Sequence, residues 1–423
     1  MKLKSLASVV VATTACLCAL PAAAAVPVID TESVSITQGR GRSIVIEYKM
    51  NPASAVDQEL AVVTVDILTN DVSVGGRHLR TLSGDVNRLV QHTADYKHKI
   101  LWSPTKEGLP EFTLPAAQVK AQITAWSTNS PPTYWIIDLT NPADRLADRY
   151  YTDAEQIPGT VTNILYKKDR LVMRRIPAKG VTWRMGGTTT YGVSTYHYVS
   201  FSYDYYMAVY EFTDAQYNHI RGSWSARSDD ALPTMWNFEN WRGNPAGASA
   251  YNWPSNGHDS VESGRIIGKL RTAVGGIPID MSTSSEWEFA CRAGTSTQYC
   301  NGDTEEDLAK VAWYSANADG VVHEVGLKEP NAWGLYDMHG NAAEFCLDKC
   351  SKLPADPVWD PTGPMQGDIV FPTDKTSRIF TLRGGGRWGD YASWSADYCT
   401  SFAVNARSAT EAVPTVRLTL LLH

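Results

Sequence analysis

The sequence predicts an all-β sandwich followed by an irregular α+β region that is rich in loops. Two observations lead to this expectation. Short apolar runs, several of them alternating with polar residues and separated by turn residues, fill about 30–140. After 165, glycine is frequent, tryptophan is dense, and the few helical signals are well capped. A chain of 423 residues also exceeds the usual size of one domain, so two to three domains are expected.

The composition excludes two classes of protein. The 38 Lys and Arg are outnumbered by 45 Asp and Glu, which gives a formal net charge of −7. We therefore expect no nucleic-acid partner, because no basic excess exists to neutralise phosphates. Disorder is not expected either, since 43% of the residues are hydrophobic. The 14 Trp and 20 Tyr stand against only 9 Phe, a bias typical of recognition surfaces and of cores built from loops.

Residues 1–25 are expected to be a secretory signal peptide. Lys2 and Lys4 precede an uncharged, mostly apolar run over 6–20, Pro21 ends this run, and four alanines at 22–25 offer a cleavage site. A membrane anchor is the alternative, but the run is short for a bilayer span. We therefore expect no membrane span after cleavage, and export to a bacterial periplasm or beyond.

The first domain is expected to span 26–140. Ile44, Ile46, Tyr48 and Met50 alternate with mostly polar residues, as in a half-buried strand. Further strands are expected at 60–68, 72–74, 98–102, 119–126 and 134–139. Their spacing favours a β-sandwich of the immunoglobulin or fibronectin type, with a spacer or interaction role. The polar, turn-rich stretch 141–165 is expected to link it to a second domain at 166–423.

Helices in the second domain are expected where capping signals occur. Thr213 followed by Gln216, and Thr283 followed by Glu286, are capping boxes. Another helix is expected to open at Ser260. Long loops dominate the remainder. Since periodic packing is scarce there, we expect large aromatic side chains and bound ions to hold the loops together.

The cysteines suit an oxidising compartment. Of seven, two lie in the signal peptide, and the others are Cys291, Cys300, Cys346, Cys350 and Cys399. Such a compartment permits disulfides, and an odd number leaves one thiol unpaired unless it pairs between chains. Cys346 and Cys350 could pair in a loop. Zinc is the weaker interpretation of this spacing, because no second cysteine pair or nearby histidine pair accompanies it.

Six sequence motifs occur in order along the second domain. They are 171–186, 206–213, 285–294 (SEWEFACRAG), 330–345 (PNAWGLYDMHGNAAEF), 383–388 (RGGGRW) and 406–408 (ARS). In this order they resemble the formylglycine-generating-enzyme family, also called the sulfatase-modifying factor family, over roughly 170–417. The resemblance implies a C-type-lectin-like α+β fold with long loops.

The resemblance also implies an activity and a cofactor. The enzymes of this family oxidise a cysteine of an unfolded sulfatase to formylglycine with copper and oxygen. Two cysteines five residues apart clamp copper(I), a soft ion that favours thiolates. Cys399 matches the first, but Val404 stands at the second position. We therefore expect the activity to be impaired or lost. Cys399 is then a remnant catalytic thiol, half of a disulfide, or a buried small residue.

The resemblance further implies calcium. Gly340, Asn341 and Glu344 are similar to a calcium site of the family, and amide and carboxylate oxygens suit this ion. Asn317 and Asp319 are candidates for a second ion. The alternative is that Asn341 caps a turn and Glu344 pairs with an arginine.

Two functions are therefore expected from different classes. One is a copper-dependent oxidase acting on a sulfatase. The other is a non-catalytic lectin-fold protein that binds a protein or glycan ligand through an aromatic surface near the C-terminus. The candidate binding residues are Trp388, Tyr391, Trp394, Tyr398 and Arg407, because aromatic and short polar residues suit a rigid recognition surface. Arg407 has a structural ion pair as its alternative role.

Overall fold

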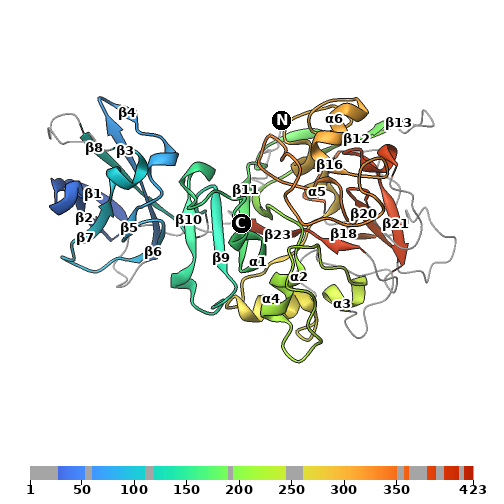
Figure 1. The fold of residues 1–423 in the computed structure, drawn as a ribbon, viewed down its shortest axis with the longest axis horizontal. Coiled ribbons are helices and arrows are strands. Elements are labelled where there is room, and N and C mark those ends of the chain that lie inside the picture. Colours follow the sequence, from blue (N-terminus) through green and yellow to red (C-terminus); the bar gives the residue numbers. More distant parts are fainter. Residues whose placement is uncertain are drawn as a thin grey trace, which may run out of the picture.

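The computed structural model describes residues 27–52, 60–109, 119–128, 130–188, 194–243, 261–349, 357–361, 379–386, 395–408 and 414–422. They form a smaller N-terminal lobe (27–128) beside a larger, loop-rich C-terminal lobe (130–422) (Figure 1). The expected signal peptide lies outside the described residues and stays a prediction. Among the described residues, no helix has the length and apolar character needed to cross a membrane.

The N-terminal lobe consists of two groups of hydrogen-bonded strands. One sheet has the order β1-β2-β7-β5, and the other has the order β4-β3-β6, with β8 also paired to β3. The strands are β1 (Val28–Gln38), β2 (Ile44–Asn51), β3 (Leu60–Thr69), β4 (Val72–Ser73), β5 (Ser83–Gly84), β6 (Arg88–Gln91), β7 (His98–Trp102) and β8 (Val119–Trp126). The alternation along β2 is confirmed, since Ile44, Ile46, Tyr48 and Met50 are buried. A β-rich N-terminal region is therefore confirmed, while the immunoglobulin or fibronectin type stays a prediction.

The strand expected at 134–139 belongs to a different sheet from the one that the sequence suggested. β9 (Tyr134–Asp138) pairs with β10 (Arg149–Tyr151) on one side and with β11 (Arg170–Ile176) on the other. It thus lies in the central sheet of the C-terminal lobe, and part of the stretch expected to be a linker forms β10. Alternation predicts that a strand exists, but burial against distant residues decides its partner.

The central sheet of the C-terminal lobe has the order β10-β9-β11-β14-β23-β15. Its other strands are β14 (Asp204–Ala208), β15 (Asp280–Met281) and β23 (Leu418–Leu422). Smaller sheets are built from β12 (Thr182–Thr188), β13 (Ser194–Ser200) and β19 (Val358–Trp359), from β16 (Ala312–Trp313) and β17 (His339–Gly340), and from β18 (Glu344–Lys349), β20 (Ile379–Arg383), β21 (Asn405–Ser408) and β22 (Thr415–Val416). Strands this short leave much of the backbone outside regular ladders.

The helices of this lobe are short. They are α1 (Leu165–Lys168), α2 (Asp214–Ile220), α3 (Phe238–Arg242), α4 (Ile266–Ala273), α5 (Ser284–Arg292) and α6 (Glu305–Val311). Both expected capping boxes are confirmed, at Thr213 before α2 and at Thr283 before α5. The helix expected to open at Ser260 begins at Ile266 instead, and Ser260 lies outside the described residues. Single 3-10 turns lie at Arg40–Arg42, Gly76–His78, Pro104–Glu107, Arg145–Ala147, Ala154–Gln156 and Ala396–Cys399.

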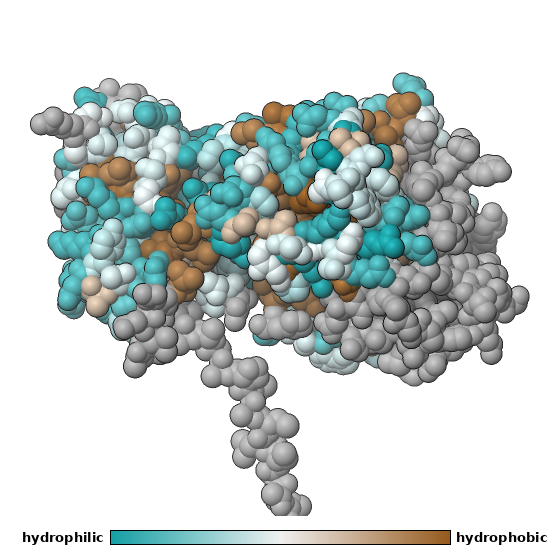
Figure 2. Space-filling model, turned by 90° about the horizontal axis from the view of Figure 1, so that it is seen from below, coloured by the Kyte–Doolittle hydropathy of each residue, from teal (hydrophilic) through white to brown (hydrophobic). Residues whose placement is uncertain are grey.

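The lobes share an apolar core at their junction. Val62 and Leu89 of the N-terminal lobe pack in one cluster with Trp135, Leu139 and Tyr150 of the C-terminal lobe. The backbone N–H of Tyr150 also donates to the carbonyl of Asn87 at 2.9 Å. Seen from below, the remaining apolar surface of the described residues forms separate patches among hydrophilic ones (Figure 2).

Candidate functional site

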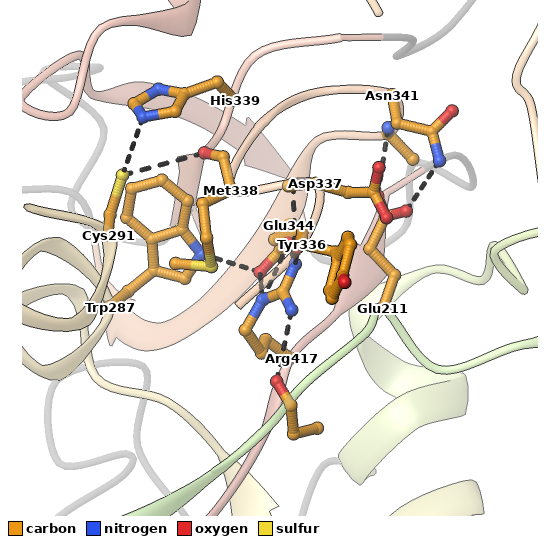
Figure 3. Close-up of polar contacts among 12 residues, drawn as sticks. Glu211, Trp287, Cys291, Tyr336, Asp337, Met338, His339, Asn341, Glu344 and Arg417 are labelled. Carbon is orange, nitrogen blue, oxygen red and sulfur yellow. Dashed lines mark hydrogen bonds and ion pairs between the residues drawn. The ribbon is translucent and has the colours of Figure 1, made fainter. Parts of the chain in front are cut away.

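Residues 335–345 of the motif at 330–345 are buried in the C-terminal lobe, and Figure 3 shows polar contacts that this motif makes with Glu211 and Arg417. Asn331 attaches it to α5, because its Nδ2 donates to the carbonyls of Ala290 and Cys291 at 2.8 and 3.1 Å. Gly340 has a φ of 84°, and a Cβ there would lie 2.1 Å from the carbonyl oxygen of Trp313. Only glycine fits this close approach. The chain can therefore turn sharply here and place Asn341 and Glu344 in the interior.

Glu344 forms a fully buried ion pair with Arg417. The Oε1 of Glu344 lies 2.6 Å from Nη2 of Arg417, and neither side chain is exposed. The indole Nε1 of Trp287 donates to the other carboxylate oxygen at 2.6 Å. Arg417 also donates to the carbonyls of Ala208 and Tyr336 at 3.2 and 3.0 Å. Glu344 thus neutralises a buried guanidinium that holds several loops together.

Two further carboxyl groups lie in the same interior. Oε2 of Glu211 accepts from Nδ2 of Asn341 at 2.7 Å, and Oε1 accepts from the N–H of Ala342 at 3.0 Å (Figure 3). Oδ2 of Asp337 accepts from the N–H of Gly326 at 2.7 Å. Burial raises the pKa of Asp337 to about 6. Burial, and then the charges of Asp337 and Glu344, also raise the pKa of Glu211 well above its ordinary value.

This carboxyl cluster was missed by the sequence analysis. Glu211 lies within the motif 206–213, and a charged residue between apolar ones was the available signal. Its partner Asn341 lies 130 residues away, so the chain order did not reveal their contact. Three carboxyl groups around one buried arginine favour retention of a proton, because burial penalises each extra negative charge.

Three of the four side chains proposed for calcium are occupied by internal contacts. Oδ1 of Asn341 accepts from the N–H of His323 at 2.9 Å, and Glu344 is paired with Arg417. Oδ1 of Asn317 accepts from the N–H of Tyr314 at 2.9 Å, and Asp319 is exposed. Within the described ranges, no three His, Cys, Asp or Glu side chains are grouped to hold a metal ion. These oxygens do not fit a calcium site as placed. The contacts correspond to the alternative in which Asn341 holds a turn and Glu344 pairs with an arginine.

A buried histidine orders the backbone beside Cys399. Nε2 of His339 accepts from the N–H of Cys300 at 3.0 Å, so its hydrogen sits on Nδ1, which donates to the carbonyl of Cys399 at 2.6 Å. Burial lowers the pKa of His339 to about 4. The ring is therefore neutral near pH 7, and it acts as a fixed bridge between two loops. The thiol of Cys291 lies 3.5 Å from Nε2 (Figure 3).

Cys399 is a buried free thiol. It belongs to a small apolar cluster with Tyr299, Leu308 and Tyr314, and none of its surface is exposed. Burial raises its pKa to about 12. Val404, which the motif resemblance predicts at the position of the second family cysteine, presents a 43% exposed hydrocarbon side chain. Of the alternatives for Cys399, the buried small residue matches this environment.

The structure does not show the suggested disulfide between Cys346 and Cys350. Cys346 is a free, buried thiol, and Cys350 lies outside the described residues. β18 runs extended from Glu344 to Lys349. Cys291, Cys300 and Cys399 are free as well.

The candidate binding residues are only partly described. Trp388, Tyr391 and Trp394 lie outside the described residues, as does the side chain of Arg407. Tyr398 is 37% exposed, so it is accessible to a partner.

The structure adds an aromatic sheet face that the sequence analysis missed. Tyr196 and Tyr198 on β13 and Trp359 on β19 are exposed. Ser200 is the register partner of Trp359, and alternate residues of a strand share a face. The guanidinium of Arg184 lies 4.3 Å from the ring centroid of Tyr196. The Tyr-x-Tyr alternation at 196–198 was the available signal.

The geometry thus defines a loop-rich domain whose centre is the motif 330–345, closed by Arg417. The model of the family described as "sulfatase-modifying factor enzyme 1-like domain" matches residues 174–414. The chain belongs to this family, and the resemblance inferred from its motifs is confirmed.

Three solved structures are similar to more than half of the chain. Treponema denticola variable protein 1 is 24% identical, with 59% of this chain and 95% of that chain covered and a TM-score of 0.42. PvdO from Pseudomonas aeruginosa is 20% identical, with 59% and 93% covered and a TM-score of 0.41. CarF is 15% identical, with 58% and 98% covered and a TM-score of 0.31. No curated protein matches the chain.

Proposed function

We propose that this protein is an exported member of its family that has lost the oxidase chemistry and binds a protein or glycan ligand. One observation carries the proposal. Where the family's two thiols are expected, the chain has the buried Cys399 and the hydrocarbon side chain of Val404. A sulfatase remains a candidate partner, because the family acts on one.

The chemistry of Cys399 argues against a copper site. The thiolate, not the thiol, is the metal ligand and nucleophile. With its pKa raised to about 12 by burial, Cys399 is a neutral thiol near pH 7. Val404 has no lone pair to offer, and both ring nitrogens of the neighbouring His339 are engaged in hydrogen bonds with backbone groups. These residues do not fit copper(I), so no oxidation step is derived for them.

Exposed aromatic residues support the binding function. Tyr398 and the aromatic face formed by Tyr196, Tyr198 and Trp359 are accessible. Tyrosine and tryptophan supply a large contact area at a low cost in conformational entropy. Asp360 fixes the strand that carries Trp359, because it accepts from the N–H and the hydroxyl of Ser202, both at 2.6 Å. A rigid aromatic platform of this kind suits recognition of a sugar ring or an apolar side chain.

Copper loading tests the loss of catalysis. The mature protein is loaded with copper(I), given a Cys-x-Pro-x-Arg peptide under oxygen, and analysed by mass spectrometry for the aldehyde product. We expect no product above a copper-free control. A Val404→Cys variant is loaded with copper(I) in parallel, and we expect it to retain more copper than the natural chain. Aldehyde formation by the natural chain that disappears in Cys399→Ser would overturn the proposal.

Array binding tests the proposed recognition surface. The protein is applied to glycan and protein arrays together with Tyr198→Ala and Tyr96→Ala variants. Both tyrosines are 53% exposed, but Tyr96 lies in the N-terminal lobe. We expect at least a tenfold weaker signal for Tyr198→Ala alone. Equal signals from both variants would place the ligand elsewhere and contradict an aromatic site on β13.

A further inference from the structure

A cavity of about 510 Å³ lies at the junction of the two lobes. Its walls come from the segment 80–88 of the N-terminal lobe and from β9, β10 and the segment 158–170 of the C-terminal lobe. Sites for small ligands commonly have volumes of roughly 300–1,000 Å³ and often lie between domains. The cavity does not involve Cys399, the carboxyl cluster or the aromatic face, so it is a separate site.

The lining of this cavity is strongly basic. Four arginines contribute to it, namely Arg80, Arg88, Arg149 and Arg170, and no Asp or Glu is among the lining residues. The chain as a whole carries a net charge of −7. The concentration of guanidinium groups around this cavity is therefore a local feature and does not follow from composition.

Two of these arginines are held by neutral groups. Nε of Arg80 donates to the carbonyl of Glu155 at 2.7 Å. Nη1 of Arg149 donates to the carbonyls of Leu146, Ala147 and Asp148 at 2.8 to 3.0 Å. Backbone carbonyls fix the orientation of a guanidinium but leave its charge in place. Among the described residues, neither arginine has a carboxylate within ion-pair distance.

The other two arginines have acidic neighbours, but Arg88 is poorly satisfied. Nη2 of Arg170 lies 3.3 Å from Asp138. Nη2 of Arg88 lies 3.8 Å from Asp85, and the buried Nε of Arg88 has no hydrogen-bond partner in the described part of the chain. An unsatisfied buried donor is costly, so Arg88 is the least well satisfied of the four arginines.

The walls of the cavity are held in place by the junction itself. Asn87, which lines the cavity, accepts from the N–H of Tyr150 at 2.9 Å. Leu89 follows Arg88 into the shared apolar core with Trp135 and Tyr150. The arginines from both lobes therefore face one space without a prior rearrangement, and preorganisation of this kind favours binding.

We propose that this cavity binds a small anion that carries at least two oxyanion groups, such as phosphate, sulfate or carboxylate groups. Guanidinium groups match these oxygens in pairs, with two parallel N–H donors. A ligand with two such groups contacts Arg80 and Arg88 from one lobe and Arg149 from the other. It thereby links the lobes, and its binding stabilises the folded chain against unfolding.

Calorimetry on the mature full-length protein tests the proposal. The probes are pyrophosphate, citrate and a disulfated disaccharide at constant ionic strength, with glucose as an uncharged control. We expect at least one of the charged probes to bind and to raise the melting temperature, and glucose to do neither. The probe that binds most tightly identifies which oxyanion the site prefers.

Charge-matched variants distinguish the cavity from general attraction. We expect Arg80→Gln combined with Arg88→Gln to weaken binding at least tenfold. Arg42→Gln serves as the single-charge control, because Arg42 is exposed in the N-terminal lobe, outside both the cavity and the aromatic face. We expect it to change the affinity less than twofold. The proposal is overturned if no charged probe binds at millimolar concentration, or if Arg42→Gln weakens binding as much as Arg88→Gln does. Neither result bears on Cys399 or the aromatic face.

Discussion

The two lobes hold their interiors together in different ways. In the N-terminal lobe, ion pairs such as that between Lys120 and Asp71 lie at the surface, and the interior is mostly apolar, with His98 as a buried polar exception. In the C-terminal lobe, three fully buried arginines, Arg242, Arg383 and Arg417, each pair with a carboxylate from another segment. These partners are Asp280 at 2.8 Å, Glu288 at 3.1 Å and Glu344 at 2.6 Å.

The difference follows from how the backbone hydrogen-bonding groups of each lobe are satisfied. A long strand satisfies its N–H and carbonyl groups within the ladder, so apolar side chains can fill the interior. A loop leaves carbonyls without partners, and arginine offers five donors to reach several of them. Arg383 accordingly lies within reach of the carbonyls of Ser401 and Ala403, at 3.4 and 3.3 Å. Each buried guanidinium then requires a buried carboxylate.

The largest effect is expected from breaking a buried pair. Arg417→Met leaves Glu344 without its counter-ion beside Glu211 and Asp337, and removing one partner of a buried pair costs about 3–5 kcal/mol. The free energy of unfolding, measured with denaturant, should fall by that amount.

A double variant separates charge from packing in this experiment. Arg417→Met combined with Glu344→Gln removes both charges, and we expect it to recover part of the lost stability. If the double variant is as unstable as the single one, the uncompensated charge of Glu344 is not the cause of the lost stability.

An apolar truncation should have the corresponding effect in the N-terminal lobe. Ile46 is fully buried, and Ile46→Ala should cost about 3 kcal/mol through lost transfer energy and a cavity. In the same lobe Lys120→Met removes an exposed ion pair and should change the free energy of unfolding by less than about 0.5 kcal/mol. Comparable losses of unfolding free energy from Ile46→Ala and Lys120→Met would contradict the conclusion that apolar packing, and not ion pairing, stabilises the N-terminal lobe.

A smaller, pH-dependent effect is expected from Asp337. Its pKa of about 6 in the folded chain lies above the ordinary value of 3.8 because the carboxyl is buried. The stability contributed by the protonated form is complete below pH 4 and is lost as the pH rises through 6. Asp337→Asn avoids this loss and should be more stable at pH 7.5 by about 1–2 kcal/mol.

The measurement for Asp337 is denaturant unfolding at pH 4, 5, 6 and 7.5. The gain in the Asn variant should shrink towards pH 4. Asp95→Asn is the control, because the side chain of Asp95 is 98% exposed. A gain that does not change with pH would show that the substitution acts through packing instead of through the proton.

Local features of the fold were predictable from the sequence. The alternation at 44–50 and the capping boxes at Thr213 and Thr283 depend on neighbouring residues, and all three are confirmed. The placement of β9 was not predictable, because its hydrogen bonds go to β11, more than thirty residues onward. Tertiary burial decides such a pairing, and a single sequence does not report it.

The candidate site was predictable only in its motif. The stretch 330–345 pointed to Asn341 and Glu344, but it did not show that Glu344 pairs with Arg417, 73 residues away. The calcium expectation treated their oxygens as free. The basic cavity was equally hidden, since its four arginines are spread from Arg80 to Arg170 and meet only where the lobes join.

The position of β9 has a practical consequence for any shortened form of this protein. A chain starting at 141, where the sequence suggested a linker, would keep β10 and β11 but lose the strand that lies between them. The residues Arg170–Arg174 of β11 would then present unpaired backbone groups along a bare edge, together with apolar side chains that Trp135 and Ile137 had covered. Such an edge invites pairing with a second copy and aggregation. A cut that keeps this sheet intact must therefore fall before β9, near 130, and it still exposes the apolar core that the two lobes share.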